Sequence, residues 1–137
     1  MTSKEIINKI KSVPDGVSDY GDCFLFLSDL EIAIDPSIWI EIFGIFERNP
    51  LADFGAPGIA VHFIERFFPD YIHDLIDSLN RSPSMAGFWM LNRILNAKLD
   101  KETKNLLLIS MKNVLTRSDV DPKIQCRAQS FLKLQMN

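Results

Sequence analysis

Histidine, cysteine and closely spaced carboxylates are the side chains of this sequence that could perform acid–base, nucleophilic or metal chemistry. The two histidines, His62 and His73, stand outside any His-Glu-x-x-His pattern, which excludes the zinc-protease motif. His62 neighbours Phe63 and Phe67, and His73 is expected on the polar face of a helix. A satisfied or solvated histidine is therefore favoured over a metal ligand. Cys23 lies in an apolar run, where a buried, unreactive thiol is the expected state.

The sequence also lacks the glycine-rich and nucleophile motifs that mark common catalytic folds. It contains no GxSxG, no GxGxxG and no phosphate-binding P-loop. We therefore predict that the protein is not an enzyme and that it uses no metal or cofactor.

Five aspartates are the candidate partner-binding residues. Asp70, Asp74 and Asp77 share one face of a predicted helix at spacings of four and three. Asp22 and Asp29 lie seven apart in an earlier predicted helix and form a second candidate strip. Like charges placed in this way usually face water, so a solvated face is one interpretation. A docking strip for a basic partner is the other.

The stretch FWMLNRILN (residues 88–96) places polar side chains inside an apolar helix. Asn92 neighbours Phe88 and Leu95 on the helical surface, and Arg93 neighbours Trp89. A buried amide or guanidinium that finds no partner costs about 1–3 kcal/mol. We therefore predict that Asn92 and Arg93 form a structural clamp that ties this helix to the loop at 48–58, with Asp53, the loop carbonyls and Glu65 as the available partners. Direct contact with a partner protein is the alternative.

The loop RNPLADFGAPG (48–58) is the longest connection that we expect. Gly55 and Gly58 indicate backbone angles that other residues avoid. The Gly55-Ala56-Pro57-Gly58 turn could offer amide groups to an anion at the start of a helix. Because no lysine is near, a structural turn is favoured, and Gly55, Pro57 and Gly58 join the predicted clamp.

The elements that must position these residues are helices. Five prolines precede or open periodic apolar segments, and proline suits the first helical turn because its missing amide hydrogen is not needed there. Asp35, Ser82 and Asp121 precede three of them as caps. We predict eight helices, over residues 3–12, 20–34, 36–47, 57–67, 69–80, 83–97, 100–116 and 121–135. Residues 23–27 and 38–43 have a strand-like composition and are the weakest of these assignments.

The last six predicted helices can be paired as antiparallel hairpins. These hairpins begin near residues 36, 69 and 100, a spacing that suits stacked two-helix units. We therefore expect an all-α fold, either a HEAT-like right-handed stack or an irregular helical bundle.

Length and composition fit one domain. The chain has 137 residues, 47% of them apolar and 24% charged, so residues 1–137 can form a single globular helical domain. No apolar run could cross a membrane, and the first residues contain no secretion signal. Cys23 and Cys126 are far apart in the sequence, so a reduced, cytoplasmic protein is expected.

The net charge of −3 hides an asymmetry along the chain. Residues 1–80 contain 14 acidic and 5 basic side chains, a balance of −9. Residues 81–137 contain 4 acidic and 10 basic side chains, a balance of +6. An acidic surface attracts basic partners and repels nucleic acid. The basic half is either a phosphate-binding surface or a solvated face, and the spread of its lysines and arginines over three segments favours the solvated face.

Four segments resemble a family of small immunity proteins from bacterial contact-dependent growth inhibition and polymorphic-toxin systems. They are FGAPGIAVHFIERF (54–67), SLNRSPS (78–84), WMLNRILN (89–96) and FLKLQ (131–135). The resemblance covers roughly residues 54–135. The chain departs from the family pattern in having Ile59 after Gly58, where a second proline is usual, and Ser84, where threonine is usual.

This resemblance implies a cytoplasmic, all-helical antitoxin without catalysis. Such a protein binds and neutralises its cognate toxin domain, here expected to be a basic nuclease, and contacts neither membrane nor nucleic acid directly. Acidic side chains can imitate nucleic-acid phosphates and speed association with a basic nuclease. The alternative function is a HEAT-like adaptor that binds proteins or nucleic acid.

Overall fold

A computed structural model describes residues 1–55 and 58–136 and shows an all-α fold. This confirms the predicted fold class, with seven α-helices in the described residues where eight were expected. The helices are α1 (Ser3–Lys11), α2 (Pro36–Arg48), α3 (Ile59–Glu65), α4 (Ile72–Arg81), α5 (Met85–Leu95), α6 (Lys101–Asn113) and α7 (Pro122–Met136). Two short 3-10 turns, η1 (Leu25–Leu27) and η2 (Val114–Thr116), complete the described elements.

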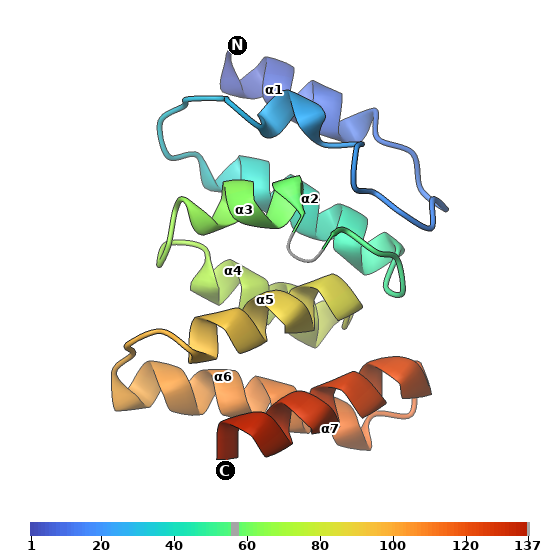
Figure 1. The fold of residues 1–137 in the computed structure, drawn as a ribbon, viewed down its shortest axis with the longest axis vertical. Coiled ribbons are helices and arrows are strands. Elements are labelled where there is room, and N and C mark those ends of the chain that lie inside the picture. Colours follow the sequence, from blue (N-terminus) through green and yellow to red (C-terminus); the bar gives the residue numbers. More distant parts are fainter. Residues whose placement is uncertain (56–57, 137) are drawn as a thin grey trace.

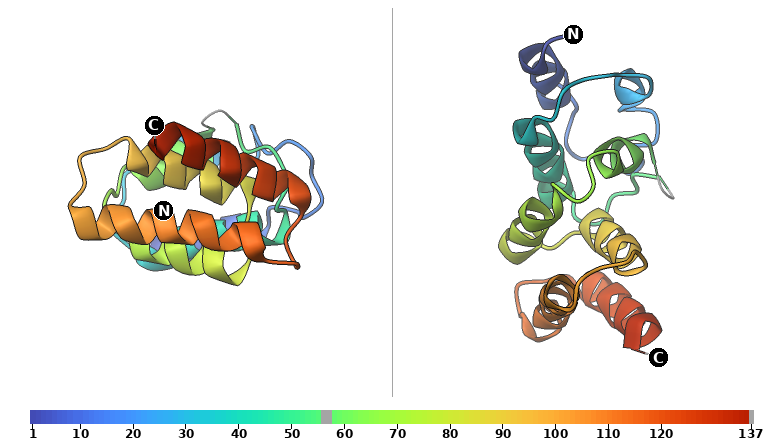
Figure 2. Two further views of the ribbon diagram at one scale, coloured as in Figure 1. Left: turned by 90° about the horizontal axis from the view of Figure 1, so that it is seen from below. Right: turned by 90° about the vertical axis from the view of Figure 1, so that its left-hand side faces the viewer.

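The helices stack in layers that follow the order of the sequence (Figure 1). From α2 onward, each layer contains a helix and the next helix returning in the opposite direction: α2 with α3, α4 with α5, and α6 with α7. Seen from the side, α1, α2, α4 and α6 form one column, while η1, α3, α5 and α7 form the other (Figure 2). The predicted antiparallel pairs are therefore present, and the HEAT-like, right-handed character of the stack stays a prediction.

The prediction of a helix over residues 20–34 is wrong. Only the turn η1 is helical there, because tertiary contacts override the local pattern. The Tyr20 ring stacks on Phe54 with centroids 4.6 Å apart. The Tyr20 amide donates to the Asp53 carbonyl, and the Asp53 amide donates to Ser18, which holds this part of the chain extended. The strand-like segment 38–43, in contrast, is helical within α2.

Helix starts follow the predicted chemistry closely in α2 and α7. Asp35 caps α2 by accepting a hydrogen bond from the Ser37 amide, and Pro36 is the first helical residue. Pro122 opens α7 in the same way. The helix expected from residue 69 begins only at Ile72, and the helix expected from residue 57 begins at Ile59.

One continuous apolar core runs the length of the stack. It includes side chains from all seven helices, among them Ile6, Trp39, Ile64, Leu75, Phe88, Met111 and Phe131. None of the helices in the described part of the chain combines the length and the apolar character that a membrane span requires.

Candidate partner-binding surface

The three aspartates predicted on one helical strip have different surroundings. Asp70 is exposed in the turn before α4, outside the helix on which it was expected. Asp77 is exposed on α4. Asp74 is half-buried, and its Oδ2 accepts a 2.8 Å hydrogen bond from Nε1 of Trp39. The strip is therefore not a uniform solvated face, because Asp74 satisfies a buried indole.

The second predicted strip does not exist, because its helix is absent. Asp22 precedes η1 and Asp29 follows it, so no helical face joins them. Both side chains are exposed. They remain candidate contact residues, but as members of an irregular segment.

A groove lies along one edge of the stack, where the connections between layers pass. Segments 28–35, 66–71 and 96–100 follow one another down this edge, on the left in Figure 1. The groove has a volume of about 650 Å³ and is lined by Ile34, Pro36, Trp39, Phe68, Pro69, Asp70, Ile72, His73, Lys98, Leu99, Asp100 and Thr103. We call this feature the edge groove.

The edge groove combines exposed apolar side chains with charged side chains of both signs. Ile34 is 59% exposed and Phe68 is 42% exposed, although both are large apolar residues. Asp70, Asp100 and the exposed Lys98 are among its lining residues, and Asp29 and Glu31 lie beside it in segment 28–35. Exposed apolar groups bordered by charge are typical of surfaces that bind another protein.

The Asp100 carboxylate is committed to the fold. It caps α6 by accepting a hydrogen bond from the Thr103 amide, and hydrogen bonding holds its pKa below the ordinary value. In contrast, Asp29, Glu31 and Asp70 have no ion-pair partner among the described residues and remain available to a basic partner.

Arg93 joins α5 to α3 and not to the loop at 48–58. Its Nε and Nη2 donate to the two carboxylate oxygens of Glu65, at 2.6 and 3.0 Å. This hydrogen-bonded pair raises the pKa of the Arg93 guanidinium. Burial raises the pKa of the neighbouring Tyr71 phenol well above its ordinary value, and the Glu65 charge adds to that effect. The stabilising role of Arg93 stays a prediction, and its recorded partner is Glu65 of α3 in place of the loop.

Asn92 also has a different partner from the one predicted. Its Oδ1 accepts a 2.9 Å hydrogen bond from Nε2 of Gln135, which also donates to Asn96 at 3.0 Å. These bonds tie α5 to the last turns of α7. The two polar side chains of the FWMLNRILN stretch therefore fasten α5 to its neighbours on two sides.

The loop after α2 is held by a residue that the sequence analysis missed. The Oδ1 of buried Asn49 accepts from the Gly16 amide at 2.7 Å, and its Nδ2 donates to Asp15 at 3.1 Å. The Asn49 hydrogen bond, with Arg48, lowers the pKa of the Asp15 carboxyl. An asparagine directly before Pro50 at a helix end was the available signal, since asparagine favours such positions.

The glycines of the predicted clamp are required for backbone reasons. Gly55 has φ +99°, which side-chain-bearing residues rarely adopt. A Cβ on Gly58 would lie 1.6 Å from the Phe54 carbonyl oxygen, so only glycine fits there. Pro57, the third predicted member of this turn, lies outside the described residues.

The side chains first considered for catalysis are dispersed. His62 and His73 are both exposed, and the nearest carboxylate oxygen recorded for either is Glu65, 3.7 Å from His62 Nδ1. Cys23 is half-buried and Cys126 is exposed, and both are free thiols. Within residues 1–55 and 58–136, no three metal-binding side chains come together.

Comparison of the chain with protein-family models, with curated proteins and with solved structures finds no match.

Proposed function

We propose that this chain is an immunity protein that binds and neutralises the toxin domain of a contact-dependent growth inhibition system. The resemblance of residues 54–135 to such proteins supplies the class of partner, and the all-helical fold is compatible with it. The observation that carries the proposal is the edge groove, because its exposed Ile34 and Phe68 and the Asp70 carboxylate, with Asp29 and Glu31 beside it, suit a basic protein surface.

The distribution of charge over the molecule supports the same partner. Because the layers follow the sequence, the −9 balance of residues 1–80 becomes one end of the stack and the +6 balance of residues 81–137 becomes the other (Figure 1). Residues 12–47 contain eight acidic and no basic side chains. Such a surface speeds association with a basic toxin domain and slows association with other acidic proteins.

Charge reversal at the edge groove tests the proposal. The variant carries Asp29→Lys, Glu31→Lys and Asp70→Lys, which alter exposed side chains. Asp74 is left unchanged because it bonds Trp39. We expect association with the toxin domain encoded beside this chain to slow by about tenfold or more at low ionic strength. The difference should shrink as salt is added, and cells that produce the toxin should lose protection.

A matched variant controls for the number of reversed charges. Lys104→Glu, Lys112→Glu and Lys123→Glu alter three exposed side chains at the other end of the stack. This variant should associate at the original rate or faster. If the folded acidic-edge variant protects cells fully with unchanged kinetics, the proposed interface is wrong. The interface would then move to the basic helices around Lys104, Lys112 and Arg127.

An adaptor that holds proteins or nucleic acid is the rival candidate. The observation that favours it is the concentration of basic side chains at the α6–α7 end of the stack. This candidate predicts salt-sensitive retention of RNA or DNA that the lysine-reversal variant loses and the acidic-edge variant keeps.

A further inference from the structure

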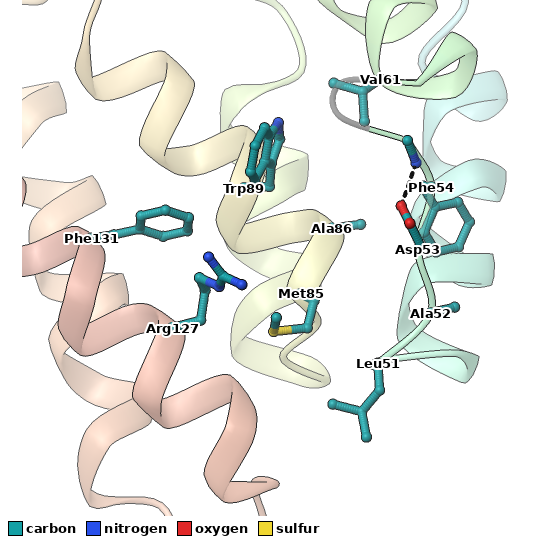
Figure 3. A pocket seen from close by; sticks show the side chains of 11 residues that line it. Leu51, Ala52, Asp53, Phe54, Val61, Met85, Ala86, Trp89, Arg127 and Phe131 are labelled. Atoms are coloured by element: carbon teal, nitrogen blue, oxygen red, sulfur yellow. Dashed lines mark hydrogen bonds between the residues drawn. The ribbon is translucent and has the colours of Figure 1, made fainter. Parts of the chain in front are cut away.

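A cavity lies between the loop after α2, the start of α5 and the middle of α7 (Figure 3). Its volume is about 260 Å³. A dry apolar cavity of about 150 Å³ can hold benzene, and pockets for drug-sized ligands begin at about 300 Å³. The space therefore suits one aromatic or branched group with a small polar attachment.

Most of the cavity wall is apolar. Val61, Met85, Ala86 and Phe131 contribute aliphatic and aromatic surface, and Trp89 lies between them. The Trp89 and Phe131 rings meet edge to face with centroids 6.4 Å apart. The Trp89 indole nitrogen is buried from solvent and has no hydrogen-bond acceptor among the described residues. These walls favour an apolar ligand body but offer it few polar partners.

Arg127 provides an exposed cation at the cavity, held over an aromatic ring. Its guanidinium carbon lies 5.8 Å from the centroid of the Phe131 ring, and the side chain reaches toward the cavity in Figure 3. Arg48, Arg81, Arg93 and Arg117 each pair with a carboxylate. Arg127 has no carboxylate within 4 Å among the described residues, so its guanidinium N–H groups can donate hydrogen bonds to an anionic ligand group.

Asp53 lines the cavity from the loop, across from Arg127 (Figure 3). Its Oδ1 accepts a 2.8 Å hydrogen bond from the Gly55 amide, and its backbone pairs with Ser18 and Tyr20. The position of this carboxylate is therefore set by the fold. Its negative charge repels anions, so a ligand carrying several negative charges, such as a phosphate or a nucleic acid, is disfavoured.

We propose that this cavity binds an apolar monocarboxylate, with its aromatic or branched body against Trp89 and Met85 and its carboxylate on Arg127. The ligand is either a free small acid or the carboxyl end of a chain, since both present the same chemistry. The proposal does not depend on toxin binding, because it rests on a different set of residues from the edge groove.

Nuclear magnetic resonance of the whole chain with 3-phenylpropionate as the probe tests this site. The protein has two tryptophans, so two indole N–H signals are expected, and Trp89→Phe assigns them. Addition of the probe should shift the Trp89 signal to saturation while the Trp39 signal stays in place. The uncharged 3-phenylpropanamide should bind about tenfold more weakly, because it loses the charge-assisted bond to Arg127.

Three variants test whether 3-phenylpropionate binding depends on the charged side chains of this cavity. Arg127→Gln should weaken 3-phenylpropionate binding about tenfold. Arg66→Gln is the matched control, since Arg66 also lies over aromatic rings and should leave binding unchanged. Asp53→Asn keeps an oxygen for the Gly55 amide and removes the repelling charge, so it should tighten binding, a gain that a misfolded protein would not give.

A tetrapeptide, Gly-Ser-Gly-Phe, identifies the source of the carboxylate. Binding of the peptide with a free carboxyl end, and not of its amidated form, assigns the site to chain ends. Binding of 3-phenylpropionate alone assigns it to free acids. Absence of any Trp89 shift, equal affinity for acid and amide, or undiminished binding by Arg127→Gln overturns the proposal.

Discussion

Exposure decides which charged side chains hold this molecule together. The Arg93 and Glu65 side chains are 38% and 20% exposed, and their contact is bidentate. The Arg48 and Asp15 side chains are 50% and 53% exposed. Because water screens exposed ion pairs, the Arg48 pair contributes little, whereas the Arg93 pair links α5 to α3 with good geometry.

Arg93→Ala should lower the free energy of unfolding by about 1–3 kcal/mol, because it leaves the half-buried Glu65 carboxylate without its donors. Chemical denaturation of Arg93→Ala, Glu65→Ala and the double variant measures this as a coupling energy. The double variant should lose less than the two single variants together. Strictly additive losses would show that the pair does not stabilise the fold.

The contact also predicts a separation of stability from binding. If Arg93 serves the fold, as predicted, its removal should leave binding of the proposed toxin domain intact in protein that remains folded. Normal stability with lost binding would make Arg93 a contact residue and would contradict the clamp.

Gly44 and Gly87 differ in the space around them. A Cβ on Gly44 in α2 would meet only the end of the flexible Arg48 side chain, at 3.2 Å. A Cβ on Gly87 in α5 would lie 2.6 Å from Leu79 of α4 and 2.8 Å from Oγ of Ser84, which caps α5. The close approach of α4 and α5 therefore depends on Gly87, while Gly44 serves no such contact.

Gly87→Ala should therefore destabilise the protein although alanine is the better helix former. The gain in helix propensity is about 1 kcal/mol, whereas overpacking a core contact costs about 1–3 kcal/mol and also displaces the cap. Gly44→Ala is the matched control and should raise the free energy of unfolding by about 0.5–1 kcal/mol. Thermal and chemical denaturation measure both variants. Stabilisation by Gly87→Ala would show that α4 and α5 are not packed as described.

At the scale of the whole molecule, several carboxylates are stabilised in their charged form. The pKa values of Asp15, Asp35, Asp100 and Asp119 are lowered, chiefly by side-chain hydrogen bonds from Asn49, Ser37, Thr103 and Arg117 respectively. A carboxyl with a lower pKa in the folded state binds fewer protons there than in the unfolded state. The stabilisation that such a carboxyl gives the folded state is complete above its pKa in the unfolded chain, about 3.9. This stabilisation is lost as the pH falls through the pKa of the carboxyl in the folded state.

The free energy of unfolding should therefore decline as the pH falls below about 4. Urea denaturation at pH 6 and pH 3 measures the change. Asp100→Asn keeps a capping oxygen for α6 but cannot titrate there, so this variant should lose less stability between the two pH values. Equal stability of the original chain at both pH values would contradict the lowered pKa values.

The sequence by itself determined the helices that carry their own start signals and an apolar face. Asp35 with Pro36 marks the start of α2, and the periodic apolar residues of 69–80 predict most of α4. These signals act within a few residues of one another, so they can be read without knowledge of the fold. The charge asymmetry along the sequence is also an asymmetry between the two ends of the folded molecule, because the layers stack in sequence order.

Only the tertiary structure decided the conformation of residues 20–34 and the hydrogen-bond partners of the polar side chains. Tyr20 packs on Phe54 and pairs with Asp53, so distant contacts displaced the helix that local apolar residues favour. The Asp74 carboxylate accepts a hydrogen bond from Trp39, 35 residues away in the sequence, and the Asn92 amide oxygen accepts one from Gln135, 43 residues away. The need of Asn92 and Arg93 for partners followed from burial, but the identity of each partner depends on which helices lie side by side, and that is set by packing of the whole core.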